Sequence, residues 1–216
     1  LQECARRNVV ARIVPDFFQL TLQQVSVGDL GGVPLISVQE IAFSRVAVVM
    51  KRGMDIVGAL LGLIVGAPLI GLIALAIKID SPGPVFFKQT RVGERGKHFQ
   101  IYKFRSMYVG AEQEQAQLQE LNEADGPLFK IRSDPRRTRM GRFLRRVSLD
   151  ELPQLVNVLL GDMSLVGPRP LLFKYIPLYS KEQKKRHLVK PGITGLAQVK
   201  GRNAISWTKK LSLIHI

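Results

Sequence analysis

Two adjacent carboxylates and a group of arginines are the side chains of this sequence best suited to chemistry. Asp150 and Glu151 follow Arg142, Arg145 and Arg146. A carboxylate can act as a nucleophile or bind a divalent cation, and an arginine binds phosphate through paired N–H donors. The combination predicts chemistry on a phosphorylated substrate. Taken alone, the same residues also fit a capped helix whose acids form salt bridges.

We expect both acids to lie in the first turn of a helix. Ser148, followed three residues later by Glu151, matches the capping-box pattern. In the other register Asp150 is itself the N-cap, and Pro153 is the third helical residue. In both registers the free backbone N–H groups and the helix dipole favour negative charge. This setting should keep a carboxylate ionised and should attract a phosphate.

A β-hairpin is predicted upstream of the acids. Residues 82–107 alternate apolar and polar side chains on both sides of a loop at Gly93–Gly96. Lys103 and Arg105 flank a phenylalanine and would share one face of the second strand.

Short helices and turns are predicted around the acids. Residues 111–124 are rich in Gln and Glu and should form an exposed helix. A basic helix should break at Ser148, and the helix that bears the acids should end in a turn at Gly161. Arg169 lies in a stiff Gly-Pro-Arg-Pro loop that fixes its direction, and residues 180–187 should form a Lys-rich helix.

A run of 22 uncharged residues, 56–77, is long enough to cross a bilayer. Pro68, preceded by Ala67, removes a backbone donor near its middle and should bend the helix. Basic residues flank both ends, and the positive-inside rule then places both ends in the cytoplasm. A helix that enters the membrane, bends and returns satisfies this rule. We therefore favour a re-entrant helix over a single span.

Charge and composition narrow the choice of partners. The 216 residues carry a formal net charge of +15. Residues 1–55 contain six basic and five acidic residues, whereas the chain from residue 78 onward contains 26 basic and 12 acidic residues. This excess suits nucleic acid, anionic lipid or phosphorylated small molecules. One cysteine and three unpaired histidines argue against a disulfide framework and a zinc site, whereas Mg²⁺ held by carboxylate and phosphate oxygens fits.

Residues 1–50 read as the end of an α/β domain whose beginning is absent. A strand is predicted over residues 8–15, and residues 27–38 read as a loop followed by a second strand. We expect the chain to be a fragment of a larger protein.

Five segments resemble the catalytic domain of bacterial polyprenyl-phosphate glycosyl-1-phosphate transferases. In chain order they are KRGMDIVGALL, SPGPVFFKQTRVG, IYKFRSM, SLDELPQLVNVLLGDMSLVGPRP and KPGITGLAQVKGRN. Their order over about 160 residues makes the resemblance specific. It implies a membrane-associated α/β (α+β) protein, held by a re-entrant helix on the cytoplasmic face of the bacterial inner membrane.

The resemblance also implies a division of the chain. Residues 1–50 would be the remnant of the preceding α/β domain, and residues 51–80 the re-entrant helix. Residues 81–210 would form a small, mostly helical catalytic domain with a β-hairpin. Residues 211–216 depart from the family and are expected to be a non-native tail. The Ala67-Pro68 pair also departs from the usual Ser-Pro, so a hydroxyl that could satisfy freed backbone groups is missing.

The chemistry implied by the resemblance is a two-step transfer. Asp150 would attack the β-phosphate of a nucleotide-sugar, usually UDP-linked, and release UMP. The phosphosugar would then pass to undecaprenyl phosphate, with Mg²⁺ required and Asp150 as its ligand. Glu151 would be the partner of the nucleophile.

Basic residues would bind the phosphates and the nucleotide. Arg145 matches the arginine that positions phosphate, Lys103 the lysine of the Lys-Phe motif, and Arg169 the arginine on the nucleotide side. Arg105, expected on the same strand face as Lys103, is assigned to the same site.

Two other functions compete with a transferase. A membrane-tethered nucleic-acid binder would explain the charge, but no recognition motif is present and we expect no nucleic-acid partner. The second competing function is a non-catalytic scaffold, and the intact Asp-Glu pair argues against it. An oligomer is compatible with the sequence.

Overall fold

The computed structural model of the protein describes residues 25–30, 33–38, 44–123, 127, 129, 131, 133–201, 207 and 211. The chain divides into two compact units, residues 1–49 and 50–216. In the first unit, β1 (Val25–Leu30) and β2 (Val33–Val38) pair antiparallel. The second strand is therefore confirmed, whereas the predicted loop is wrong for the residues of β1. The strand predicted over residues 8–15 lies outside the described residues.

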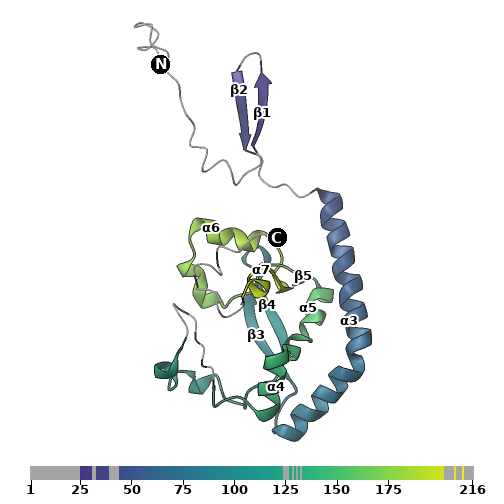
Figure 1. Ribbon diagram of the computed structural model, residues 1–216, viewed down its shortest axis with the longest axis vertical. Helices are drawn as coiled ribbons and strands as arrows, with labels where there is room; N and C mark the ends of the chain where they lie inside the picture. The colour runs from purple at the N-terminus through teal and green to yellow at the C-terminus, as the bar shows by residue number, and fades with distance from the viewer. Residues whose placement is uncertain are drawn as a thin grey trace. The chain divides into compact units, whose positions relative to one another are not determined.

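A single long helix, α3 (Arg45–Asp80), contains the whole apolar run. It begins where the Ser44 hydroxyl oxygen accepts a hydrogen bond from the Ala47 N–H, a usual N-cap contact. Its length and composition are sufficient to cross a membrane. Pro68 lies inside the helix, and Figure 1 shows α3 changing direction along its length without a break in the ribbon. The re-entrant path in a bilayer stays a prediction.

One face of α3 packs against the rest of the second unit through small residues. Ala59 is fully buried, and a Cβ added to Gly58 would lie 2.7 Å from the Leu165 side chain. A Cβ at Gly62 would lie 3.1 Å from Leu155 of α5 (Gln154–Leu160). The absence of a side chain at Gly58 and Gly62 therefore lets α3 approach Leu165 and α5, and α5 runs beside α3 in Figure 1.

Polar contacts fix the first turns of α3 to the same region. Asp55 is buried and accepts hydrogen bonds from Lys51 Nζ (2.5 Å), Ser164 Oγ (3.1 Å) and the Leu165 N–H (3.0 Å). Arg52 donates to two carbonyls at the end of α5, those of Val158 and Leu159. A cation at this position also complements the helix dipole.

The predicted hairpin is confirmed. Strands β3 (Phe86–Val92) and β4 (His98–Phe104) pair antiparallel, with Phe86 opposite Phe104 and Val92 opposite His98. The connection contains a 3₁₀ turn, η1 (Glu94–Gly96), in which Gly96 has a φ of 76°. Gly-containing loops of this length are typical of hairpins.

Two apolar clusters hold the hairpin between α3 and the short helices. The first contains Ala59, Phe99, Ile101, Val158 and Met163. The second contains Ile73, Ile77, Phe104 and Leu144. Residues from both halves of α3 are thus part of the core. Many of its other apolar side chains are exposed, including Val57, Ile64, Val65 and Leu72.

The basic helix and its break are confirmed, but the capping box is wrong. Helix α4 (Arg139–Val147) ends at Ser148, which has a φ of 62° and makes no side-chain capping bond. The acids lie in a 3₁₀ turn, η4 (Leu149–Glu151), and α5 begins only after Pro153. The left-handed backbone at Ser148 is the reason, because a capping residue needs an extended conformation. Helix α5 ends at Gly161, as predicted, with a φ of 93°.

Residues 111–124 differ from their prediction. Among the described residues of this segment, two 3₁₀ turns replace the expected helix, η2 (Gln113–Gln115) and η3 (Gln119–Leu121). Exposure was predicted correctly, since most of these side chains reach solvent. A segment that packs little apolar surface has little to stabilise a longer helix.

The remaining elements surround the third cluster. Strands β5 (Ser164–Val166) and β6 (Gly192–Thr194) form a short parallel pair. The Lys-rich segment forms α6 (Lys181–Lys184) and η6 (Lys185–Leu188), and it lies between η5 (Phe173–Leu178) and α7 (Leu196–Val199) in the chain. Tyr175, Tyr179 and Leu211 form the buried centre of this cluster. Leu211, expected to begin a non-native tail, is fully buried there.

Candidate active site

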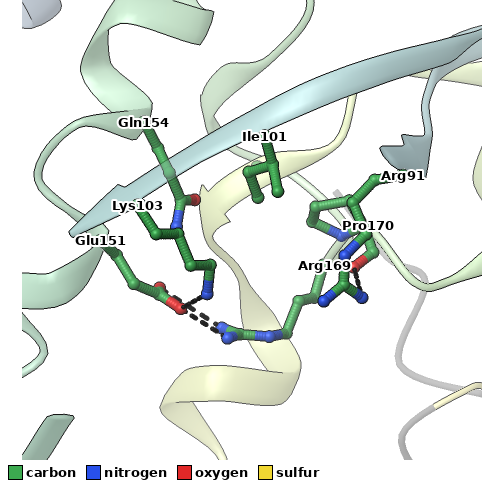
Figure 2. A pocket seen from close by; sticks show the side chains of 8 residues that line it. Arg91, Ile101, Lys103, Glu151, Gln154, Arg169 and Pro170 are labelled. Carbon is green, nitrogen blue, oxygen red and sulfur yellow. Dashed lines mark hydrogen bonds and ion pairs between the residues drawn. The ribbon is translucent and has the colours of Figure 1, made fainter. Parts of the chain in front are cut away.

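Glu151 lies between two cations at one end of a pocket. Its Oε1 is 2.7 Å from Lys103 Nζ and 2.6 Å from Arg169 Nη2. Figure 2 shows the three side chains converging from β4, from the turn before α5 and from the Gly-Pro-Arg-Pro loop. Burial raises the pKa of Glu151, but Arg169 and Lys103 outweigh it and hold the pKa at about 2. The glutamate is therefore ionised at neutral pH.

The hairpin register brings a further arginine to the same pocket. In the pairing of β3 with β4, Phe87 is opposite Lys103 and Gln89 is opposite Ile101. Alternate residues share one face, so Arg91 lies on the face of Lys103. Arg91 lines the pocket and donates to Gln89 Oε1 at 2.6 Å. Burial and the nearby charge of Arg169 lower the pKa of Arg91 to about 10.

Arg91 was missed by the sequence reasoning, although the hairpin pattern could have found it. Counting in steps of two from Lys103, across the loop, leads to the Arg91 position. The other residues that line the pocket are Ile101, Gln154, Pro170 and Gly192.

Asp150 differs sharply from its neighbour. It is 8% exposed, and its carboxylate has no hydrogen-bond partner among the described residues. Burial raises the pKa of Asp150, and the charges of Lys103 and Arg145 only partly oppose this effect. The helix start was expected to favour the ionised form of this carboxylate, and burial opposes that form.

Arg145 and Arg146, in the last turn of α4, are both solvent-exposed. Arg145 Nε donates to Ser106 Oγ at 2.8 Å, and its charge acts on Asp150. A Cβ at Gly141 would clash with the Ser106 backbone, so α4 contacts that backbone directly. The glycine thereby brings Ser106 within reach of Arg145.

Arg105 is not brought to the pocket. Strand β4 ends at Phe104, so the face that Arg105 would share with Lys103 does not extend to it. Arg105 is buried, with 5% of the residue exposed. Its guanidinium donates to the Ser81 carbonyl, the Ser81 hydroxyl and the Pro82 carbonyl. Arg105 therefore ties the hairpin to the end of α3.

The loop that carries Arg169 is held from two sides. Arg186 Nη2 donates to the Arg169 carbonyl at 3.0 Å, and the Arg186 guanidinium lies over the Tyr179 ring. On the other side, the Gly167 N–H donates to the Thr194 carbonyl of β6 at 2.9 Å. These contacts fix the backbone from which Arg169 reaches Glu151. No local signal in the sequence pointed to Arg186.

Residues 46–214 match the family model for bacterial sugar transferases. The chain belongs to the bacterial sugar transferase family. The match covers α3 from its second residue onward and every residue of the pocket. It extends past residue 211, within the segment expected to be non-native.

Three relatives show how far the similarity extends. The uncharacterized sugar transferase EpsL of Bacillus subtilis is 46% identical over 165 residues, which cover 76% of this chain and 75% of the relative. The UDP-glucose:undecaprenyl-phosphate glucose-1-phosphate transferase of Escherichia coli is 43% identical, covering 88% of this chain and 39% of its own. An Aeromonas hydrophila UDP-N-acetylgalactosamine-undecaprenyl-phosphate N-acetylgalactosaminephosphotransferase is 45% identical, covering 69% and 34%. The chain thus spans about a third to two fifths of the two larger relatives.

The donor set of this bacterial sugar transferase fits one kind of metal ion. Among the described residues, no group of three or more His, Cys, Asp or Glu side chains could hold a metal. Among the described residues the Asp150 carboxylate has no hydrogen-bond partner, and its neighbour Glu151 lines a pocket that also holds Arg91, Lys103 and Arg169. Mg²⁺ commonly uses one or two carboxylates and completes its coordination with phosphate oxygens and water. Asp150 fits that use.

Proposed function

We propose that this protein transfers a sugar 1-phosphate from a nucleotide diphosphate sugar, expected to be a UDP-sugar, to undecaprenyl phosphate. Two adjacent acids with opposite surroundings carry this conclusion. Glu151 is held between Lys103 and Arg169, whereas the Asp150 carboxylate has no hydrogen-bond partner among the described residues, which supports its role as the nucleophile. The names of the relatives support both the donor and the acceptor.

In the first step, an Asp150 carboxylate oxygen attacks the β-phosphorus of the donor. The bond between that phosphorus and the bridging oxygen breaks, and the bridging oxygen leaves with UMP. The sugar phosphate is then joined to Asp150 as an acyl phosphate. A carboxylate nucleophile in this way divides one difficult exchange into two easier steps.

In the second step, a phosphate oxygen of undecaprenyl phosphate attacks the same phosphorus. The bond to Asp150 breaks, the carboxylate is released, and a lipid-linked diphosphosugar is formed. This product would begin the assembly of a surface polysaccharide or glycoconjugate.

The basic residues stabilise charge on the phosphates. Lys103 and Arg169 already point to one carboxylate oxygen, so the pocket is preorganised for an anion. Arg145 is placed to act on the phosphorus that Asp150 attacks, since its charge already acts on that carboxylate. Mg²⁺ bound by Asp150 would neutralise phosphate charge and favour the ionised carboxylate.

The membrane would present the lipid acceptor to the site. We place α3 in the cytoplasmic leaflet of the bacterial inner membrane as a re-entrant helix bent at Pro68. Its exposed apolar side chains and its basic flanks support this position. The excess of basic residues from residue 78 onward suits anionic headgroups.

The test is UMP release by the full-length protein in membranes with undecaprenyl phosphate and a panel of UDP-sugars. Asp150→Asn should abolish UMP release and the covalent phosphosugar adduct, which intact mass spectrometry detects in the wild type. A mutant that keeps substantial UMP release would move the nucleophile elsewhere, with Glu151 examined next. No UMP release from the wild type with any UDP-sugar would refute the proposed function.

A further inference from the structure

Helix α5 carries two buried amides one turn apart, and only one of them is hydrogen-bonded. Asn157 is fully buried, donates to the Gln100 carbonyl at 2.7 Å and accepts from the Tyr102 N–H at 3.0 Å. It therefore joins α5 to β4. Gln154 is 2% exposed, and its Nε2 has no hydrogen-bond partner in the described part of the chain.

The Gln154 side chain lines the pocket of Glu151. Figure 2 shows it extending from α5 toward the region that holds Lys103 and Glu151. A second buried donor without a partner, Arg91 Nε, lines the same pocket. Because native proteins pair nearly all their buried polar groups, two unpaired donors at one pocket indicate a missing acceptor.

The charges of the pocket indicate what that acceptor is. Lys103, Arg91 and Arg169 contribute three positive charges, and Glu151 contributes one negative charge. The excess attracts an anion, and an unpaired N–H needs an oxygen that accepts hydrogen bonds. A phosphate group satisfies both requirements.

We propose that Gln154 is a substrate-binding residue, whose amide N–H donates to a non-bridging oxygen of the phosphate that Lys103 and Arg169 bind. This inference rests on the proposed function and adds a residue to it. A neutral amide supplies a directed donor without adding charge to a pocket that already holds three cations. Gln154 would thereby select the orientation of the phosphate, whereas the cations supply attraction.

A purely structural role for Gln154 predicts that removing its amide would lower the stability of the ligand-free protein. A structural amide is paired, as Asn157 is, and its removal leaves two backbone groups of β4 without partners. Removing the Gln154 amide leaves no group of the described residues unpaired. The ligand-free protein should therefore tolerate Gln154→Met, whose side chain is similar in length and apolar, and should lose stability in Asn157→Leu.

The experiment compares Gln154→Met with the wild type in the full chain, reconstituted in lipid nanodiscs. Isothermal titration with UDP and with inorganic phosphate measures binding, and thermal unfolding without ligand measures stability. We expect the affinity for both probes to fall about tenfold or more, the effect of losing one hydrogen bond to a charged group. The melting temperature should stay unchanged or rise. Gln154→Glu, which replaces the donor with an anion, should weaken UDP binding further.

Several results would overturn the inference. Wild-type affinity for UDP in Gln154→Met would show that the amide does not contact the ligand. A loss of affinity for UDP but not for phosphate would place Gln154 at the nucleoside instead. A loss of stability in Gln154→Met as large as that in Asn157→Leu would make the amide structural. In each case, retained UMP release by the wild type leaves the proposed function standing, whereas absent UDP binding by the wild type refutes both.

Discussion

The neighbouring acids Asp150 and Glu151 should affect stability in opposite directions. Glu151 has a pKa of about 2, against 4.5 for a free glutamate. This difference corresponds to about 3 kcal/mol in favour of the ionised form in the folded state. Burial lowers the pKa of Lys103, so the lysine offsets part of this gain. We expect Glu151→Gln to lower the free energy of unfolding at pH 7 by roughly 1–3 kcal/mol.

Whether the ionised form of each acid stabilises the folded protein follows from the pKa of that acid in the folded and unfolded states. The folded pKa of Glu151 is depressed, so its contribution is complete above the unfolded value near 4.5 and is lost as the pH falls toward 2. The folded pKa of Asp150 is raised, so its ionised form destabilises the protein at neutral pH. Asp150→Asn should therefore be more stable than the wild type at pH 7, although we expect it to be inactive.

Denaturant unfolding of the two variants and the wild type, from pH 7 down to pH 3, measures these differences. Trp207 is the only tryptophan of the chain and packs against Tyr175, so its fluorescence should report unfolding of the catalytic domain. The difference in the free energy of unfolding between the wild type and Glu151→Gln should become smaller as the pH falls. A gap independent of pH, or an Asp150→Asn variant less stable than the wild type at pH 7, would refute the electrostatic reasoning.

Three further predictions concern the arginines, the base of α3 and its path. Arg145→Lys keeps the charge but loses the paired donors, so we expect transition-state binding to weaken by about 2 kcal/mol. The rate of UMP release should then fall about thirtyfold. An equal fall in Arg146→Lys would contradict a specific role for Arg145. Asp55→Ala removes the ion pair with Lys51 and leaves the Leu165 N–H without its acceptor, so thermal unfolding should show a loss of about 2 kcal/mol. An unchanged melting temperature would contradict the role of this contact. Cysteines placed at positions 45 and 88 should both be protected from impermeant reagents in spheroplasts, and periplasmic labelling of one alone would contradict the re-entrant path.

The sequence predicted the elements whose patterns are local. The hairpin follows from the alternation of residues 82–107 around a Gly-containing loop, and the ends of α4 and α5 follow from a break and a glycine. Lys103 and Arg169 were assigned to the site from the family motifs, and both lie beside Glu151 in the structure.

The errors arose where tertiary packing decides the outcome. The capping box at Ser148 matched a pattern, but the left-handed backbone at this residue is set by how α4 meets the turn η4. Arg105 was assigned by strand alternation beyond the last paired residue, and its burial beneath α3 is a long-range contact. Gln154 gave no signal, because an unpaired amide is visible only after the surrounding side chains are placed.

The way α3 is built into the domain limits how a soluble form of this enzyme could be engineered. Deleting the helix would remove Ala59, Ile73 and Ile77 from the core, together with Asp55 and its buried contacts. What remains would expose the apolar surfaces of β4 and α5 and would be prone to aggregate. Solubility would have to come instead from polar substitutions at outward positions of the helix, such as Val57, Ile64, Val65 and Leu72. Helix α3 can be redesigned on its outer face, but it cannot be deleted.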